Sequence, residues 1–307
     1  MTETELYKDK QWLPTTKKEI EHLGWDYIDV IIFSGDAYID HPSMGSAVIG
    51  RILEANGYRV AIVPQPNWRD DLRDFTKLGK PRLFFGVSAG AMDSMVNHYT
   101  ANRRKRSDDA YTPNGKAGMR PDYPSIIYTQ ALKKLYPDVP VIIGGIEASM
   151  RRLSHYDYWQ DTLRPSILID SKADILVYGM GEKPILEIAN YLRDGKQISE
   201  LTDIPQTAIC VNASSIPEHL DSEKEELLHS HEECLKDKKL HAANFKVIEI
   251  ESNKWQGRTL WQKVGNRAVK VNGTNPPLSE SEIDSSFDLP YTRLPHPRYR
   301  GKRIPAY

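Results

Sequence analysis

Residues 25–65, WDYIDVIIFSGDAYIDHPSMGSAVIGRILEANGYRVAIVPQ, decide the fold class of this chain. Asp29–Phe33 is a short run rich in β-branched residues, which is typical of a strand buried on both faces. Met44–Ala55 carries its apolar residues on one face of a helix, and Tyr58–Val63 is a second apolar strand. A strand, a helix and a strand in this order predict a parallel pair joined by a right-handed crossover.

The same alternation continues along the chain. Thr16 and Glu19 fit a capping box, which predicts a short helix over Thr16–Leu23. Three further strands are expected at Arg82–Val87, Val139–Ile143 and Ala173–Tyr178, and three further helices at Ala91–Tyr99, Ser125–Tyr136 and Ile185–Leu192. Five strands alternating with helices predict an α/β fold with a doubly wound, five-stranded parallel sheet.

The C-terminal part of the chain differs in kind. Pro217–Lys239 is charged and helical in pattern, Phe245–Glu251 resembles a strand, and Thr259–Val264 with Arg267–Val271 resembles a β hairpin. From Pro276 onward, prolines exclude a packed element of any length and indicate an extended strap or a linker. The expected division is an N-terminal extension and helix (1–24), an α/β domain (25–215), a charged helix with a hairpin (216–275) and a proline-rich tail (276–307).

The composition narrows the class of protein. The chain has 307 residues, 39% of them hydrophobic and 27% charged, with a formal net charge of −1, which predicts a globular, soluble protein. A net charge near zero gives no global argument for nucleic acid or a membrane surface. Neither a transmembrane run nor an apolar signal core is evident. Two cysteines, Cys210 and Cys234, cannot build a disulfide framework or a four-ligand metal site, so we expect the reducing cytoplasm.

The unusual polar stretches all follow predicted strands directly. They are Gly35–Gly45, Ser88–Asn114, Gly144–Gln160 and Gly179–Pro184. The carboxyl ends of parallel strands meet at one edge of the sheet, where doubly wound folds bind their ligands. The sequence therefore predicts a ligand-binding edge without naming the ligand.

Several side chains in these stretches are candidate contacts, each with a structural alternative. Asp36 is a ligand contact or a turn former. Arg103 and Arg104, in NRRKRSDD, clamp a phosphate or carboxylate, or lie in a solvated loop. Nucleic-acid binding is a further use of such a run, because tyrosines and Trp159 stand nearby in the sequence and could stack on bases.

Three other groups of residues also have both a functional and a structural interpretation. Arg151 and Arg152 bind an anion, or they pair with Glu147, Asp157 or Asp161. Glu182 contacts a ligand, or it is a helix-start carboxylate favoured by the helix dipole. His229, His231 and Cys234 lie in one charged segment, where a solvated face is favoured over a metal site.

One spacing pattern resembles the cobalamin-binding domain, which is flavodoxin-like. Asp40-His41 with Gly45, then Ser88, then Gly144-Gly145, resemble its Asp-x-His-x-x-Gly, Ser-x-Leu and Gly-Gly elements. The resemblance implies that His41 would reach cobalt as an axial ligand, and that the serine and glycines would admit the nucleotide tail. Here, however, Asp40 and His41 are adjacent, three residues separate His41 from Gly45, and Ser88-Ala89-Gly90 lacks the leucine.

A resemblance to a second family covers nearly the whole chain. GWDYIDVIIFSGDAYIDHPSMGSAVIGRILEANGYRVAI, FFGVSAGAMDSMVNHYTANRRKRSDDAYTPNGKAGMRPD, VIIGGIEASMRRLSHYDYWQD and FDLPYTRLPHPRYRGKRIPAY are similar to the N-terminal region of YgiQ-type radical SAM proteins. The family's chains continue into a barrel whose Cys-x-x-x-Cys-x-x-Cys motif binds an iron–sulfur cluster that reductively cleaves S-adenosylmethionine. This sequence stops before that motif, so we expect an N-terminal region that catalyses nothing by itself.

These resemblances lead to one main hypothesis and two alternatives. The chain is expected to position a substrate or a second cofactor, with cobalamin as one candidate, over its own missing barrel. Alternatively it is a stand-alone module for a nucleotide-like or anionic ligand, or an RNA-interaction domain; no membrane partner is expected. The candidate residues for the cofactor are Asp36, His41, Ser88, Gly90, Gly144, Gly145 and Glu182, and those for the substrate are Arg103, Arg104, Arg151, Arg152 and His155. Neither a metal site nor a catalytic residue is expected.

Overall fold

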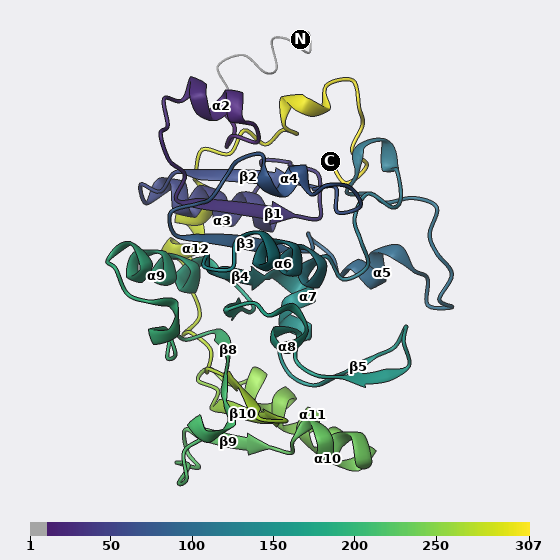
Figure 1. Ribbon diagram of the computed structural model, residues 1–307, viewed down its shortest axis with the longest axis vertical. Coiled ribbons are helices and arrows are strands. Elements are labelled where there is room, and N and C mark those ends of the chain that lie inside the picture. Colours follow the sequence, from purple (N-terminus) through teal and green to yellow (C-terminus); the bar gives the residue numbers. More distant parts are fainter. Residues whose placement is uncertain (1–10) are drawn as a thin grey trace.

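The computed structural model describes residues 11–307, and its centre is a nine-stranded, mixed sheet. The strand order is β2-β1-β3-β4-β7-β8-β11-β10-β9. Figure 1 shows the parallel half of the sheet with its helices in the upper part, and the last strands with α10 and α11 in the lower part. The protein is therefore an α/β protein whose sheet is mostly parallel, as the alternation of elements predicts.

Five parallel strands form the half of the sheet that positions the site. They are β2 (Val60–Pro64), β1 (Val30–Ser34), β3 (Phe84–Ser88), β4 (Val141–Gly144) and β7 (Ile175–Val177). Each overlaps a strand expected from the sequence. The chain runs from β1 outward to β2 and then returns to the other side of β1 to form β3. The strand order therefore reverses between β1 and β3, and such a reversal leaves room for a ligand at the carboxyl edge.

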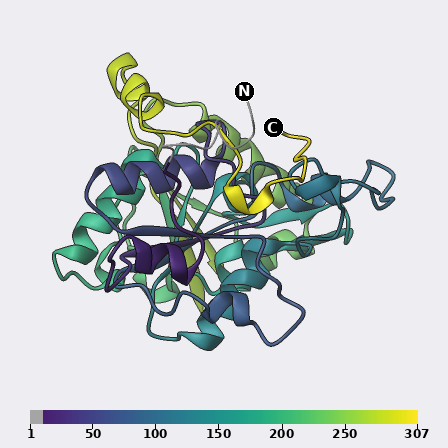
Figure 2. The same cartoon turned by 90° about the horizontal axis from the view of Figure 1, so that it is seen from above.

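Helices cover both faces of these strands, because successive side chains of a strand point to opposite faces. One face packs against α3 (Gly45–Ala55) and α9 (Glu182–Arg193). The other packs against α4 (Arg73–Thr76), α6 (Pro124–Leu135) and α8 (Ile167–Ser171). Figure 2 shows helices on both sides of the strands. No helix among residues 11–307 has the length and apolar character that crossing a membrane requires.

Short elements complete this half. The capping box at Thr16 is confirmed, because its side chain accepts the Glu19 amide at the start of α2 (Lys17–His22). Two short helices follow β3 and β4, namely α5 (Ser94–His98) and α7 (Gly145–Met150). A separate two-stranded sheet comes next, formed by β5 (His155–Asp157) and β6 (Thr162–Arg164).

The sheet continues without a break beyond β7. β8 (Thr207–Asn212) runs antiparallel to β7 and to β11 (Arg267–Val271). β11 forms the predicted hairpin with β10 (Thr259–Val264), and β9 (Glu225–Leu228) lies parallel to β10 at the edge. β8 thus joins the last strands to the parallel strands in a single sheet.

Two predictions for this region are wrong. Pro217–Lys239 is not one helix but β9 followed by α10 (His231–Lys236), since Ser230 and Glu233 form a capping box that starts a new helix. Phe245–Glu251 is not a strand but part of α11 (Lys238–Ser252). Its alternating Val-Ile-Glu-Ile sequence imitates a strand, yet Val247 and Ile248 pack side by side against the core, as neighbouring positions of one helix face can.

The proline-rich tail packs against the body of the protein. It contains one α-helix, α12 (Glu280–Phe287), and a 3-10 turn at Pro297–Tyr299; none of the residues of α12 is buried, so this helix is not a packed element of the kind that the prolines were expected to exclude. Beyond it, Pro295 forms a β bridge with Ile39, and Leu294, Tyr299 and Ile304 are buried. The tail is therefore a strap across the loop that follows β1.

Candidate ligand site

A cavity of about 320 Å³ opens between α3, α9 and the carboxyl ends of the parallel strands. α3 and α9 lie beside each other on this face of the sheet. Its floor is apolar and comes from β1, β3, β4 and β7; the floor residues are Ile32, Phe84, Gly86, Ile142 and Val177. The cavity therefore lies where the reversal of strand order predicts a ligand.

Glycines shape this cavity. Gly86 stands in the middle of β3, and a Cβ there would lie 3.5 Å from Ile32 Cγ1, in ordinary van der Waals contact. The missing side chain therefore leaves the floor open. Gly145 has φ +83°, and a Cβ there would lie 2.8 Å from Ser88 Oγ, so this turn after β4 requires glycine.

Most polar groups of the cavity lie near the N-terminal ends of α3 and α9. Ser43, Ser46 and Ser88 contribute hydroxyl groups to its wall. Neither α3 nor α9 starts with a side-chain cap, which leaves first-turn amides available to a ligand. Glu182, the first residue of α9, also lines the cavity, and its buried Oε2 has no hydrogen-bond partner among the described residues. A ligand with hydrogen-bond donors would satisfy that oxygen.

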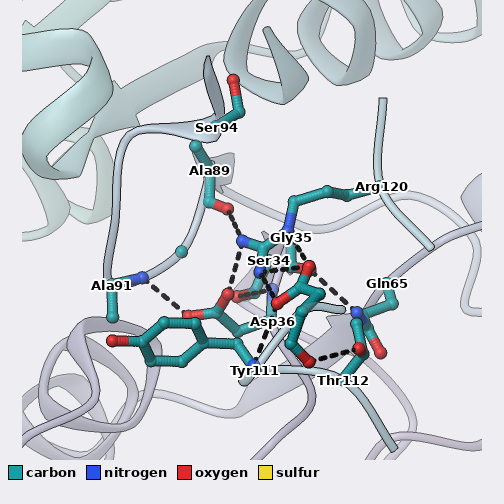
Figure 3. A network of polar contacts seen from close by, with 12 residues as sticks. Ser34, Gly35, Asp36, Gln65, Ala89, Ala91, Ser94, Tyr111, Thr112 and Arg120 are labelled. Carbon is teal, nitrogen blue, oxygen red and sulfur yellow. Dashed lines mark hydrogen bonds and ion pairs between the residues drawn. The ribbon is translucent and has the colours of Figure 1, made fainter. Parts of the chain in front are cut away.

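Asp36 belongs to a buried network of charged side chains next to the carboxyl edge of the sheet (Figure 3). Its Oδ1 accepts a hydrogen bond of 2.6 Å from Arg120, and its Oδ2 accepts the Ala91 amide at 2.6 Å. Arg120 also donates to both carboxylate oxygens of Asp109. Burial raises the pKa of Asp36, although Arg120 acts in the opposite direction. A side chain at Gly90 would overlap the Asp36 carboxylate, so Asp36 and Gly90 are packed together and hold the loop after β3.

His41 directly precedes Pro42 and Ser43, which line the cavity, and its contacts differ from those that the cobalamin resemblance implies. Its Nδ1 lies 2.8 Å from Ser43 Oγ and accepts the Ser43 amide at 3.1 Å, so Nδ1 has no proton to give to an aspartate. Asp40 is fully buried and pairs with Arg51 at 2.5 Å, and it also accepts the Thr292 amide. The aspartate–histidine pair that the cobalamin resemblance implies is therefore not formed.

Arg151 contributes to a structural cluster on the opposite face of the sheet. It is buried, and it pairs with Asp93 rather than with the partners considered from the sequence. Glu147, one turn earlier, accepts the amides of Ser94 and Ser125 and so caps the starts of α5 and α6. These charges fix the helices after β3 and β4, and Asp93 is the counterion of Arg151.

The other predicted substrate contacts lie away from the cavity. Arg103 and Arg104 are exposed on the loop that projects after α5 (Figure 1), and Arg103 stacks on Tyr158 with its Cζ 4.6 Å from the ring centroid. Burial lowers the pKa of His155 to about 4, so its imidazole is neutral at pH 7. Arg152 is half-buried between α7 and α11 and donates to Ser252 Oγ at 3.0 Å.

The structure thus separates the predicted residues into groups. Ser88, Gly144, Gly145 and Glu182 line one cavity, and Asp36 with Gly90 supports it. Sequence reasoning missed Gly86, Ser43, Ser46 and Gly181 as parts of the same wall. Only Gly86 gave a signal, because a glycine inside an apolar strand indicates a close approach.

The cysteines stand apart. Cys234 is buried and its Sγ accepts a hydrogen bond from Asn244 Nδ2 at 3.2 Å, and Cys210 lies on β8. His231, on α10 with Cys234, bonds through Nδ1 to Ser154 Oγ at 3.0 Å. Among residues 11–307, no three histidine, cysteine or acidic side chains are grouped to hold a metal ion.

Comparison with known proteins shows which family this chain belongs to. The family described as Radical SAM N-terminal matches residues 12–307. The chain belongs to this family. A UPF0313 protein of Bacteroides thetaiotaomicron is 62% identical over 98% of this chain and 50% of its own length. A UPF0313 protein of Porphyromonas gingivalis is 64% identical over 96% of this chain and 46% of its own.

The resemblance to YgiQ-type proteins is also confirmed. The UPF0313 protein YgiQ of Escherichia coli is 45% identical to this Radical SAM N-terminal chain over 96% of it and 47% of its own length. The chain spans about half the length of the curated relatives it matches.

Proposed function

We propose that this chain is the accessory half of a radical SAM iron–sulfur enzyme and holds a ligand in the cavity between α3 and α9. The observation that carries the proposal is the position of the cavity at the carboxyl edge of the parallel strands in a Radical SAM N-terminal chain. The order β2-β1-β3-β4-β7 corresponds to the flavodoxin-like order and supports a doubly wound, cobalamin-domain type of unit. The chain by itself catalyses nothing in this proposal.

The chemistry of the cavity favours a nucleoside-sized ligand. A volume of about 320 Å³ with an apolar floor accommodates a flat ring, and the serine hydroxyls suit a sugar or an amide. The unpartnered Oε2 of Glu182 would accept a hydrogen bond from that ligand. Both the base and ribose of a nucleoside carry such donors.

The cofactors of radical SAM chemistry belong to the other half of the full-length enzyme in this proposal. An iron–sulfur cluster would there supply the electron that cleaves S-adenosylmethionine, and three thiolates would hold it. Cys210 and Cys234 lie on separate elements and do not fit such a cluster. Cobalamin, if it occupies the cavity, would bind without His41 as its ligand.

The carboxyl edge is proposed to face that other half. Ile146 and Met150 on α7, Met180 after β7 and Trp255 after α11 are exposed apolar side chains at this edge. The Gly179 amide donates to Ser149 Oγ at 3.2 Å, so α7 lies against the turn that carries Met180. Exposed apolar groups of this kind mark surfaces that dock a partner.

The cavity is tested with the substitution Gly86→Ala. The added methyl group makes only ordinary contact with Ile32, so the melting temperature of the ligand-free protein should stay equal or rise slightly. The same methyl group occupies the floor of the cavity and should weaken ligand binding. Thermal shift and calorimetry with adenosine, adenosine monophosphate and hydroxocobalamin measure both effects.

The matched controls separate the outcomes. Glu182→Gln should weaken a bound nucleoside, whereas Glu187→Gln on the same helix should not, because Glu187 does not line the cavity. Binding of no probe, or binding that Gly86→Ala leaves unchanged, would overturn the proposal.

A second candidate function is supported by the loop after α5. Arg103, Arg104, Lys105 and Arg106 are exposed and form no ion pair with any residue from 11 to 307, and Tyr156 and Tyr158 lie close by. Cations beside aromatic rings suit single-stranded RNA. Binding of an oligonucleotide that weakens steeply with salt and is lost in Arg103→Ala/Arg104→Ala would favour this function. Salt-independent or absent binding would exclude it.

A further inference from the structure

Arg152 is a half-buried cation without a carboxylate partner. Of the described arginines, Arg51, Arg120 and Arg151 are fully buried, and each pairs with an aspartate. Arg152 instead donates to two neutral acceptors, the Ser149 carbonyl at 2.7 Å and Ser252 Oγ at 3.0 Å. A buried charge without a counterion is unfavourable, so this position calls for an anion.

The remaining contacts of Arg152 do not include a hydrogen bond to a carboxylate. Its guanidinium lies 4.9 Å from the ring centroid of Tyr178, and its buried Nε has no partner in the described chain. The nearby carboxylate of Glu251 is already occupied, because it accepts hydrogen bonds from Arg258 and Lys254. Burial lowers the pKa of the Arg152 guanidinium, and the charges of Tyr178 and Glu249 offset this effect only in part.

A hollow lies directly beside this guanidinium. It has a volume of about 70 Å³, and its lining includes Arg152, Tyr178, Ser252, Asn272 and Thr274, together with the ion pair of Glu251 and Arg258. Ser252 and Thr274 also line a larger, open cleft of about 390 Å³. The larger cleft is walled by Trp255, whose side chain is 78% exposed, and by Met180, Lys183, Lys254, Pro276 and Pro277. The small hollow and the larger cleft are therefore neighbours that share part of their walls.

We propose that the hollow and the cleft together form a groove that is a second ligand site, which binds a phosphate or carboxylate group at Arg152 and a flat, apolar body against Trp255. Arg152 would donate charge-assisted hydrogen bonds to the anion, with the hydroxyls of Ser252 and Thr274 beside it. Lys183 and Lys254 line the open end, where they pair with Glu282 and Glu251 at 2.8 Å each. Met180 lines both this groove and the cavity between α3 and α9, so the two sites share one edge.

The proposal is tested with phenyl phosphate, with phenol and inorganic phosphate as probes that each carry one half of the molecule. Calorimetry should show that phenyl phosphate binds the wild-type protein more tightly than either. Arg152→Met should weaken its binding roughly 10- to 100-fold, the range expected for lost hydrogen bonds to a charged group. The melting temperature should change little, because the loss of two hydrogen bonds to neutral acceptors is offset by the removal of a half-buried charge that has no counterion.

Three further variants make the result decisive. Trp255→Ala removes an exposed side chain and should weaken phenyl phosphate but not inorganic phosphate. Arg103→Met removes an exposed cation outside the groove and should change nothing. Gly86→Ala fills the other cavity and should also change nothing, so the two sites can fail independently.

The contrary results are equally clear. Equal binding of phenyl phosphate and phenol, or binding that survives both Arg152→Met and Trp255→Ala, would overturn the proposal. If Arg152→Met does not fold, an unchanged affinity in Trp255→Ala would overturn it alone. Binding of inorganic phosphate without preference for the aromatic ester would reduce the site to a simple anion site and contradict the role of Trp255.

Discussion

Asp36 shows how far a single residue can be understood from its neighbours in the sequence. A carboxylate directly after a buried strand predicts either a ligand contact or a turn. Its partner Arg120 is 84 positions away, and no local pattern links the two. The grouping of Ser88, Gly144 and Gly145 is easier to predict, because these residues must meet once β3 and β4 are neighbours.

The network around Arg120 gives a prediction at the residue scale. Arg120→Met leaves the carboxylates of Asp36 and Asp109 buried without a cation, so it should lower the free energy of unfolding by about 3–5 kcal/mol. Arg73→Met is the matched control, because its pair with Asp71 is exposed to solvent and is expected to contribute little to stability. Urea unfolding of both variants measures the difference. Equal losses would show that the buried network does not stabilise the edge.

At the scale of elements, the helices and strands with a clear hydrophobic pattern could be predicted, whereas the charged segment around α10 and α11 could not. Strands β1, β3 and β4 are continuous apolar runs, and the β10–β11 hairpin is marked by Gly265-Asn266. The Phe245–Glu251 part of α11 resembles a strand in sequence, because its β-branched residues alternate over a few positions. The caps at Ser230 and Asp237 are local signals within a highly charged segment, whereas the pairing of β9 with β10 is a tertiary contact that overrides local preferences.

The end of α11 supports a prediction for the pH dependence of stability. Burial of Glu251 raises its pKa, but hydrogen bonds from Arg258 and Lys254 outweigh burial and lower the pKa from 4.5 to about 2. A carboxylate with a lowered pKa in the folded state stabilises the protein above pH 4.5, and this contribution is lost as the pH falls toward 2.

Glu251→Gln should therefore reduce stability at pH 7 and remove part of the loss on acidification. Urea unfolding between pH 7 and pH 2.5 measures the gap between wild type and variant, which should narrow with falling pH. Glu249→Gln, an exposed position on the same helix, should leave the pH profile unchanged. A gap that stays constant with pH would contradict the assignment.

At the scale of the whole molecule, the α/β class, the family and the gathering of polar loops at one edge of the sheet could be predicted from sequence, but the packing of the tail against the body could not. Prolines after position 276 indicate an extended course and do not say what the strap lies on. The structure shows that it crosses the loop after β1, with the His296 amide donating to the Tyr38 carbonyl at 3.0 Å. Contacts across more than 250 positions carry no local signature.

The strap gives a prediction with a control in the same segment. Ile304 is buried, so Ile304→Ala should reduce the free energy of unfolding by about 2–5 kcal/mol. Phe287, in the exposed helix α12, is half-exposed, and Phe287→Ala should cost far less, within about 1 kcal/mol. Urea unfolding distinguishes them. Similar small losses would mean that the tail is not part of the folded body.

The central claim is that the carboxyl edge, with its cavity, faces the other half of a radical SAM enzyme. Cross-linking with mass spectrometry on a full-length protein that carries this chain tests it most directly. Lys183 and Lys254 lie at the carboxyl edge, whereas Lys80 and Lys134 are exposed at the opposite edge. We predict cross-links from Lys183 and Lys254 to lysines beyond position 307. Cross-links from Lys80 and Lys134 instead would contradict the claim.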